Sequence, residues 1–122
     1  MITIAKIFCH GLLTIDGKLL ILQRDNNKVY PNLWDLPGGF KEENEGFKDC
    51  VIREFKEETG LSIEVGELID IKSQLYNGEI IIVLFYQVKT NDYNIILNKE
   101  HVNYEYVDNF KNKDLIWYLK GY

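Results

Sequence analysis

Four glutamates and one arginine in the middle of the chain have the residue types and the spacing of a metal site. They lie within residues 39–61, which read GFKEENEGFKDCVIREFKEETGL. On a helix that turns by roughly 100° per residue, Glu57 and Glu58 lie about 60° and 40° to either side of Glu54. Three carboxylates then share one side of the helix, and Glu54 and Glu58 repel each other as an i,i+4 pair. Crowded carboxylate oxygens of this kind suit Mg²⁺ or Mn²⁺ as ligands. The alternative to a metal site is an acidic, salt-bridged helix on the protein surface.

The helix that must position these groups is predicted over residues 47–59. This segment contains no Gly or Pro, and Gly60 stands at the C′ position where helices commonly end. Phe47, Cys50 and Val51 fall on the same stripe as the carboxylates, so the first two turns are expected to face the core and the last two the site. Arg53 lies at the edge of the cluster, where one guanidinium can orient one carboxylate but cannot neutralise three.

The order of these residues resembles the signature of the Nudix hydrolases. Gly39 is followed by five residues and Glu45, then by seven residues and REFKEETGL, which starts at Arg53. Phe55 stands where the family usually has an aliphatic residue, and Asn44 where a glycine often precedes the glutamate. The resemblance is specific over residues 24–61 and diffuse elsewhere. It implies an α/β fold, namely an α/β/α sandwich with a mixed β-sheet and a central catalytic helix.

The resemblance also implies a role for each residue of the cluster. Glu57 and Glu58 would bind Mg²⁺ (or Mn²⁺) together with the carbonyl of Gly38. Glu54 would share the metal or activate the attacking water, and Arg53 would orient Glu54. Glu45 would support the site from the start of the helix, and no protein nucleophile is needed.

Four residues outside the helix are further candidates. Arg24 is similar to a family arginine that reaches substrate phosphate, although a surface arginine explains it equally well. Trp34 either stacks on the base or packs in the core, and Gly39 is expected at the substrate. Glu100 resembles a further metal ligand or base in some relatives, so the general base stays open between Glu54 and Glu100. The adjacent His101, like His10, is expected to be an ordinary hydrogen-bonded histidine.

The family hydrolyses nucleoside diphosphates linked to another moiety, and a small domain of this kind most resembles the MutT-like group. That group converts a nucleoside triphosphate, in some cases an oxidised purine nucleotide, into a monophosphate and pyrophosphate. The alternatives within the enzyme class are dinucleoside polyphosphate hydrolases and ADP-ribose or nucleotide-sugar pyrophosphatases. Tyr76 is similar to a tyrosine that the dinucleoside polyphosphate hydrolases have in this region. A non-catalytic nucleotide-sensing module is the alternative of another class, but such modules commonly lose the carboxylates that this chain retains.

Composition limits the partners. The 122 residues carry a formal charge of −5 and are 46% hydrophobic, which predicts one domain over residues 1–122 and disfavours a nucleic acid polymer as substrate. The resemblance implies a small-molecule nucleotide as substrate. We expect no membrane segment and no signal peptide, because the chain lacks a long apolar run. Cys9 and Cys50 are predicted to be free thiols of a cytoplasmic protein, either a monomer or a homodimer.

The remaining elements follow from local patterns. Apolar, β-branched runs predict strands at residues 2–8, 12–15, 18–24, 61–65, 68–76, 79–89 and 104–107. Asp16-Gly17 and Asn77-Gly78 predict tight hairpin turns. Residues 25–33 are expected to form a loop, residues 90–98 a loop or a short edge segment, and residues 111–119 a short C-terminal helix.

Overall fold

The structure is a computed structural model that describes residues 4–122. Its central strand β1 (Ala5–Ile15) is continuous through His10 and Gly11, so the two strands predicted at residues 2–8 and 12–15 are one. Residues 2 and 3 of that prediction lie outside the described part of the chain. β2 (Lys18–Arg24) matches its predicted bounds. Two short strands that the sequence did not indicate follow, β3 (Trp34–Asp35) and β4 (Gly38–Phe40).

Both predicted hairpin turns are confirmed by their backbone angles. Asp16 and Gly17 have φ angles of 52° and 77°, and Asn77 and Gly78 have 50° and 76°. Two successive residues with positive φ are what a type I′ turn requires. The first turn joins β1 to β2, and the second joins β5 (Ile63–Tyr76) to β6 (Glu79–Thr90). β5 merges the strands predicted at residues 61–65 and 68–76, and its register shifts twice between Val65 and Asp70.

The strands form one mixed sheet in the order β3-β2-β1-β6-β5. β1 runs parallel to β6, whereas the other pairings are antiparallel. β4 pairs with β1, and β7 (His101–Val107) pairs with β2. β7 begins at His101 rather than at the predicted Tyr104, which brings Arg24 of β2 opposite His101. Strands from both ends of the chain therefore meet beside the predicted site.

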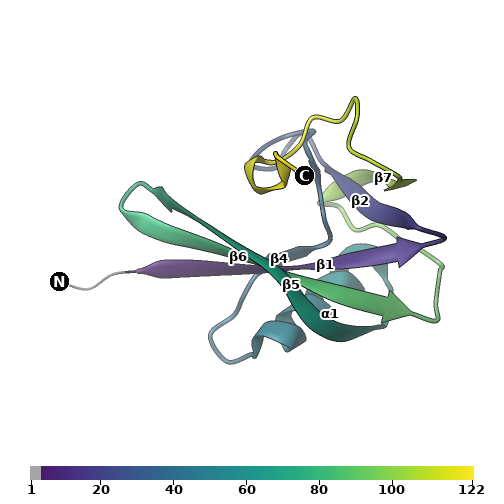
Figure 1. The fold of residues 1–122 in the computed structure, drawn as a ribbon, viewed down its shortest axis with the longest axis horizontal. Coiled ribbons are helices and arrows are strands. Elements are labelled where there is room, and N and C mark those ends of the chain that lie inside the picture. Colours follow the sequence, from purple (N-terminus) through teal and green to yellow (C-terminus); the bar gives the residue numbers. More distant parts are fainter. Residues whose placement is uncertain (1–3) are drawn as a thin grey trace.

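Helix α1 (Phe47–Thr59) has the predicted bounds and covers one face of the sheet (Figure 1). It ends at Gly60, which has a φ of 75° and donates its N–H to the Lys56 carbonyl at 3.0 Å. One hydrophobic cluster fills the space between the helix and the sheet, with Phe55 fully buried. The expectation that Phe47 faces the core is wrong. As the first helical residue it has a neighbouring turn on one side only, and it is 43% exposed.

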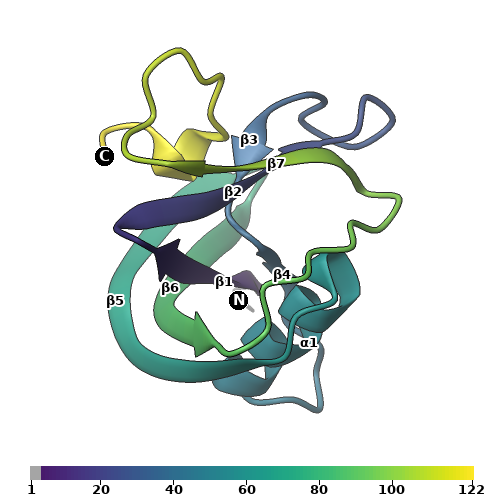
Figure 2. The ribbon, with the colours of Figure 1, turned by 90° about the vertical axis from the view of Figure 1, so that its right-hand side faces the viewer.

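The C-terminal segment covers the opposite face of the sheet (Figure 2), so the predicted sandwich is confirmed. The predicted helix at residues 111–119 is wrong, because only the 3₁₀ turn η1 (Trp117–Leu119) forms. The backbone of Trp34 uses the groups that a helix would need. It donates to the Asp114 carbonyl at 2.7 Å and accepts from the Ile116 N–H at 3.1 Å. In the part of the chain that the structure describes, no helix is long and apolar enough to cross a membrane.

Candidate active site

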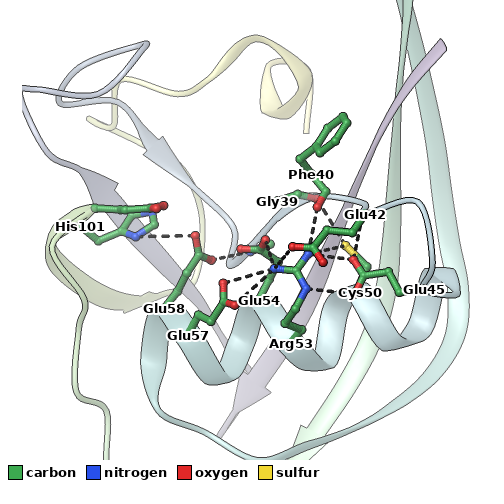
Figure 3. A network of polar contacts seen from close by, with 12 residues as sticks. Gly39, Phe40, Glu42, Glu45, Cys50, Arg53, Glu54, Glu57, Glu58 and His101 are labelled. Carbon is green, nitrogen blue, oxygen red and sulfur yellow. Dashed lines mark hydrogen bonds and ion pairs between the residues drawn. The ribbon is translucent and has the colours of Figure 1, made fainter. Parts of the chain in front are cut away.

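Arg53 is the centre of the predicted site, and its guanidinium binds three of the four glutamates (Figure 3). It donates to Glu45 from Nε and Nη2 at 2.9 and 2.8 Å, which is a bidentate pair. Nη1 donates to Glu54 at 2.9 Å and to Glu57 at 3.2 Å. Nη2 also donates to the Phe40 carbonyl at 3.0 Å. The helix, the segment before it and β4 are therefore tied together by one side chain.

These contacts set the charge states of the cluster. Hydrogen bonds from Arg53 lower the pKa of Glu45 to about 2. The pKa of Arg53 is raised in return, chiefly by Glu45. Burial raises the pKa of Glu54, and Arg53 only partly offsets this effect. Glu45 is thus a fixed anion that holds the guanidinium, whereas Glu54 is a carboxylate poised to take a proton.

Glu58 lies deepest in the site, only 3% exposed. Its carboxylate accepts a hydrogen bond from the Gly38 N–H at 2.8 Å and lies 3.8 Å from Nδ1 of His101. Burial raises the pKa of Glu58 well above its usual range despite the Gly38 bond, and Glu54, Asp35 and Glu100 raise it further. Burial lowers the pKa of His101 to about 4, so this imidazole is neutral at pH 7 and cannot compensate the carboxylate.

Gly38 and Gly39 permit the close approach that the sequence suggested. Gly38 has a φ of 153°, and a Cβ there would lie 2.3 Å from the Cys9 carbonyl oxygen. A Cβ on Gly39 would lie 2.7 Å from the carboxylate of Glu54. The helix carboxylates therefore pack directly on the backbone of β4, which places the Gly38 and Gly39 peptide groups beside the acidic cluster.

The residues predicted outside the helix lie around this cluster in different ways. Arg24 is 17% exposed in its side chain and lies 3.7 Å from Asp35. Glu100 is 48% exposed in its side chain and pairs with Lys28 at 3.4 Å. Trp34 is 7% exposed, packs in the second hydrophobic cluster and carries the Lys113 ammonium 4.5 Å above its ring. The roles of these three residues in binding or catalysis stay predictions.

Two polar groupings beside the site were not predicted from the sequence. His101 was expected to be an ordinary hydrogen-bonded histidine, but its Nδ1 is buried without a hydrogen-bond partner among the described residues. Asp35, Tyr118 and His10 form a second, fully buried grouping. The available signal was a polar residue inside an apolar stretch, as for His10 in strand β1 and for Asp35 between Trp34 and Leu36.

The donor set fits a hard divalent cation. Glu54, Glu57 and Glu58 supply carboxylate oxygens, and the buried Glu58 has a raised pKa that a nearby cation would relieve. Within residues 4–122, no three Cys, His, Asp or Glu side chains already converge on one point as ligands. Figure 3 shows why: Glu54 and Glu57 are turned toward Arg53. To share a cation with Glu58, both would rotate away from the guanidinium.

Two surface hollows lie elsewhere on the molecule, at the paired ends of β5 and β6. They have volumes of about 460 and 400 Å³ and share Glu64 and Lys89 in their walls. Neither includes any predicted site residue. The chemistry of the acidic cluster, rather than the size of a hollow, therefore marks the candidate site.

Comparisons with known proteins agree with the fold and the motif. The NUDIX domain model matches residues 7–114. Among curated relatives, an ADP-ribose pyrophosphatase from Methanocaldococcus jannaschii is 41% identical over 63 residues, which cover 52% of this chain and 37% of that protein. A CTP pyrophosphohydrolase from Escherichia coli is 35% identical over 66 residues, covering 54% and 49%. The chain thus aligns with less than half the length of either relative.

Solved structures extend the similarity to most of the chain. The MutT protein from Methanosarcina mazei superposes with a TM-score of 0.79 at 27% identity, covering 88% of this chain and 79% of that one. A Caenorhabditis elegans Ap4A hydrolase has a TM-score of 0.66 at 22% identity, covering 86% and 80%, and shares the fold. Because the family model spans most of the sequence and the structure has the same mixed sheet and site helix, the chain belongs to the Nudix hydrolase family.

Proposed function

We propose that this protein hydrolyses a nucleoside diphosphate linked to another moiety, with Mg²⁺ or Mn²⁺ as cofactor. The favoured reaction is MutT-like, the conversion of a nucleoside triphosphate into a monophosphate and pyrophosphate. The observation that carries the proposal is the buried Glu58 beside Gly38, next to two more carboxylates held by Arg53. A purely structural surface helix would expose Glu58 rather than desolvate it.

Glu54, Glu57, Glu58 and the Gly38 carbonyl would hold the metal. When bound, the metal neutralises charge on the pyrophosphate and lowers the pKa of the attacking water. Arg53 and Glu45 tie the helix to β4, which keeps the carboxylate-bearing turns of the helix beside the Gly38 and Gly39 backbone.

Glu54 is the better candidate for the general base. It is held by Arg53, and its raised pKa lies closer to neutrality than that of an exposed carboxylate. Glu100 is the alternative, but it is more exposed and is paired with Lys28. Replacing each with Gln separates them, because loss of the base lowers kcat by orders of magnitude, whereas loss of a peripheral carboxylate does not.

A second candidate is hydrolysis of ADP-ribose. The observation that favours it is the 41% identity to a protein described as an ADP-ribose pyrophosphatase. That identity covers 63 residues, which are 52% of this chain and 37% of that protein.

One experiment tests both. The purified protein is incubated with Mg²⁺ and a panel of nucleoside triphosphates, including oxidised purine nucleotides, together with ADP-ribose and diadenosine polyphosphates. We expect monophosphate and pyrophosphate in equal amounts from a triphosphate, and no turnover in excess EDTA. Cleavage of ADP-ribose alone would establish the second candidate, and full turnover in EDTA would exclude the metal-dependent mechanism.

A further inference from the structure

A buried chain of polar side chains links the C-terminal turn to Arg24. The Tyr118 hydroxyl, from η1, lies 3.0 Å from His10 Nε2 and donates a hydrogen bond to Asp35. Asp35 in turn lies 3.7 Å from Nη1 of Arg24. Tyr118, His10 and Asp35 are each at most 6% exposed. Four elements thus contribute to one polar chain, since the residues come from β1, β2, β3 and η1.

The directions of these hydrogen bonds are set by the groups themselves. The carboxylate of Asp35 can only accept, so the single hydroxyl proton of Tyr118 must be donated to it. The remaining lone pairs of Tyr118 then accept from Nε2 of His10, which must carry a proton. The order is therefore His10 to Tyr118 to Asp35, and Nη1 of Arg24 lies near the same Asp35 oxygen, Oδ2, that accepts from Tyr118.

The same grouping keeps Asp35 charged although it is buried. Burial alone would raise its pKa, but His10, Tyr118 and Arg24 together hold the pKa of Asp35 below its usual range. Burial and then Asp35 raise the pKa of Tyr118 well above its usual range, so the hydroxyl keeps its proton. An anionic Asp35 with a permanent donor on one side is a fixed charge against which Arg24 can be oriented.

Arg24 is restrained at two points. Nε donates to the Val29 carbonyl at 2.7 Å, and Nη1 faces Asp35. The Arg24 backbone N–H also donates to the Leu33 carbonyl at 2.9 Å. The guanidinium is consequently held at the end of β2, where Arg24 pairs with His101, whose ring faces Glu58.

We infer that Tyr118 is a positioning residue, which holds Asp35 so that Arg24 presents its guanidinium to a phosphate group of the substrate. This inference rests on the proposed function, because it assigns Arg24 to the phosphates of a nucleotide. Among the described residues, the Tyr118 hydroxyl bonds His10 and Asp35 and none of the helix carboxylates. Its loss should weaken substrate binding and leave the hydrolytic step intact.

The test begins with Tyr118→Phe, which keeps the ring and removes the hydroxyl. We expect KM to rise about five- to tenfold for every triphosphate substrate, with kcat changed by less than about twofold. Tyr86→Phe is the matched control, because Tyr86 is also 6% exposed but lies in the other hydrophobic cluster. It should leave both constants unchanged. A rise in KM confined to one base would mean that the hydroxyl contributes to base recognition, and the inference would be wrong.

A double-mutant cycle shows whether Tyr118 acts through Arg24. Arg24→Ala alone should raise KM at least as much as Tyr118→Phe, and the double variant should be no worse than Arg24→Ala. Independent, multiplying effects of the two changes would overturn the inference. Asp35→Asn provides a second route, since it keeps the shape of the side chain but removes the charge that faces Arg24, and it should reproduce the rise in KM.

Binding of a non-hydrolysable triphosphate analogue with Mg²⁺, measured by calorimetry, separates this inference from the proposed function. If the wild type binds the analogue but hydrolyses nothing, the proposed function fails while the affinities of the same variants still test Tyr118. Weaker binding by Tyr118→Phe, with unchanged binding by Tyr86→Phe, supports the inference. Equal binding by the wild type and Tyr118→Phe, or no binding by the wild type, overturns it.

Discussion

Replacing Arg53 with Gln should destabilise the protein in a pH-dependent way. The pKa of Glu45 is lowered from 4.5 to about 2, chiefly by hydrogen bonds from Arg53. At roughly 1.4 kcal/mol per pKa unit, this shift corresponds to at most about 3.5 kcal/mol at neutral pH. Solvent near the partly exposed pair reduces that figure, and we expect a loss of about 2 kcal/mol in the free energy of unfolding at pH 7.

The sign of the pH dependence follows from the direction of the shift. A carboxyl whose pKa is lowered by folding stabilises the protein above its unfolded pKa, and this contribution disappears as the pH falls through the folded value. The difference between wild type and Arg53→Gln should therefore be fully present above about pH 5 and fall to less than half at pH 3. Urea unfolding in EDTA at pH 7 and pH 3 measures it, since urea adds no ionic strength.

Lys56→Gln is the matched control, because it removes a cation from the same helix. Lys56 contacts the Gly60 carbonyl at 3.1 Å rather than a carboxylate. Its replacement should change the free energy of unfolding by less than about 0.5 kcal/mol at both pH values. If Arg53→Gln lost the same free energy at pH 3 as at pH 7, the guanidinium would stabilise the fold by packing, and the electrostatic reasoning would be refuted.

Three further predictions concern the site. Glu58→Gln should lower turnover by orders of magnitude yet raise metal-free stability at pH 7, because the raised pKa of Glu58 means that its charged form opposes folding at that pH. Thermal melts in EDTA should show this gain in stability vanish near pH 4, and a variant less stable than the wild type at pH 7 would contradict the prediction. Glu57→Gln should lose activity with little change in melting temperature, since the Glu57 side chain is 54% exposed. Near-wild-type turnover of this variant would show that Glu57 is not a metal ligand. Gly38→Ala should abolish activity and destabilise the fold, because its Cβ would lie 2.3 Å from the Cys9 carbonyl oxygen. Gly17→Ala is the control, since Gly17 also has a positive φ but no atom lies within 4 Å of the added Cβ; it should lower the free energy of unfolding by only about 1 kcal/mol and keep turnover. Kinetics and urea unfolding of both variants measure these effects.

Local chemistry explains which elements could be predicted. The Asp16-Gly17 and Asn77-Gly78 turns each depend on two adjacent residues that tolerate positive φ. A few neighbouring residues are therefore enough to predict each turn. The bounds of α1 follow in the same way from the absence of helix breakers and from Gly60. The C-terminal helix was also predicted from local sequence. It does not form, because the backbone of Trp34, far away in the chain, hydrogen-bonds to the Asp114 carbonyl and the Ile116 N–H.

The acidic cluster was readable from the sequence because one helix carries most of it. Helical spacing places Arg53, Glu54, Glu57 and Glu58 within two turns, so their proximity needs no long-range contact. The tertiary structure decided what surrounds that helix. His10 and Tyr118 are 108 residues apart, and Tyr118 and Asp35 are 83 apart. They meet because β1 pairs with β2, β2 pairs with β3, and Trp34 of β3 pairs with Leu115 of the C-terminal segment. Burial of Glu58 against Gly38 has the same origin, because desolvation depends on the strand packed over the helix and not on the spacing within it.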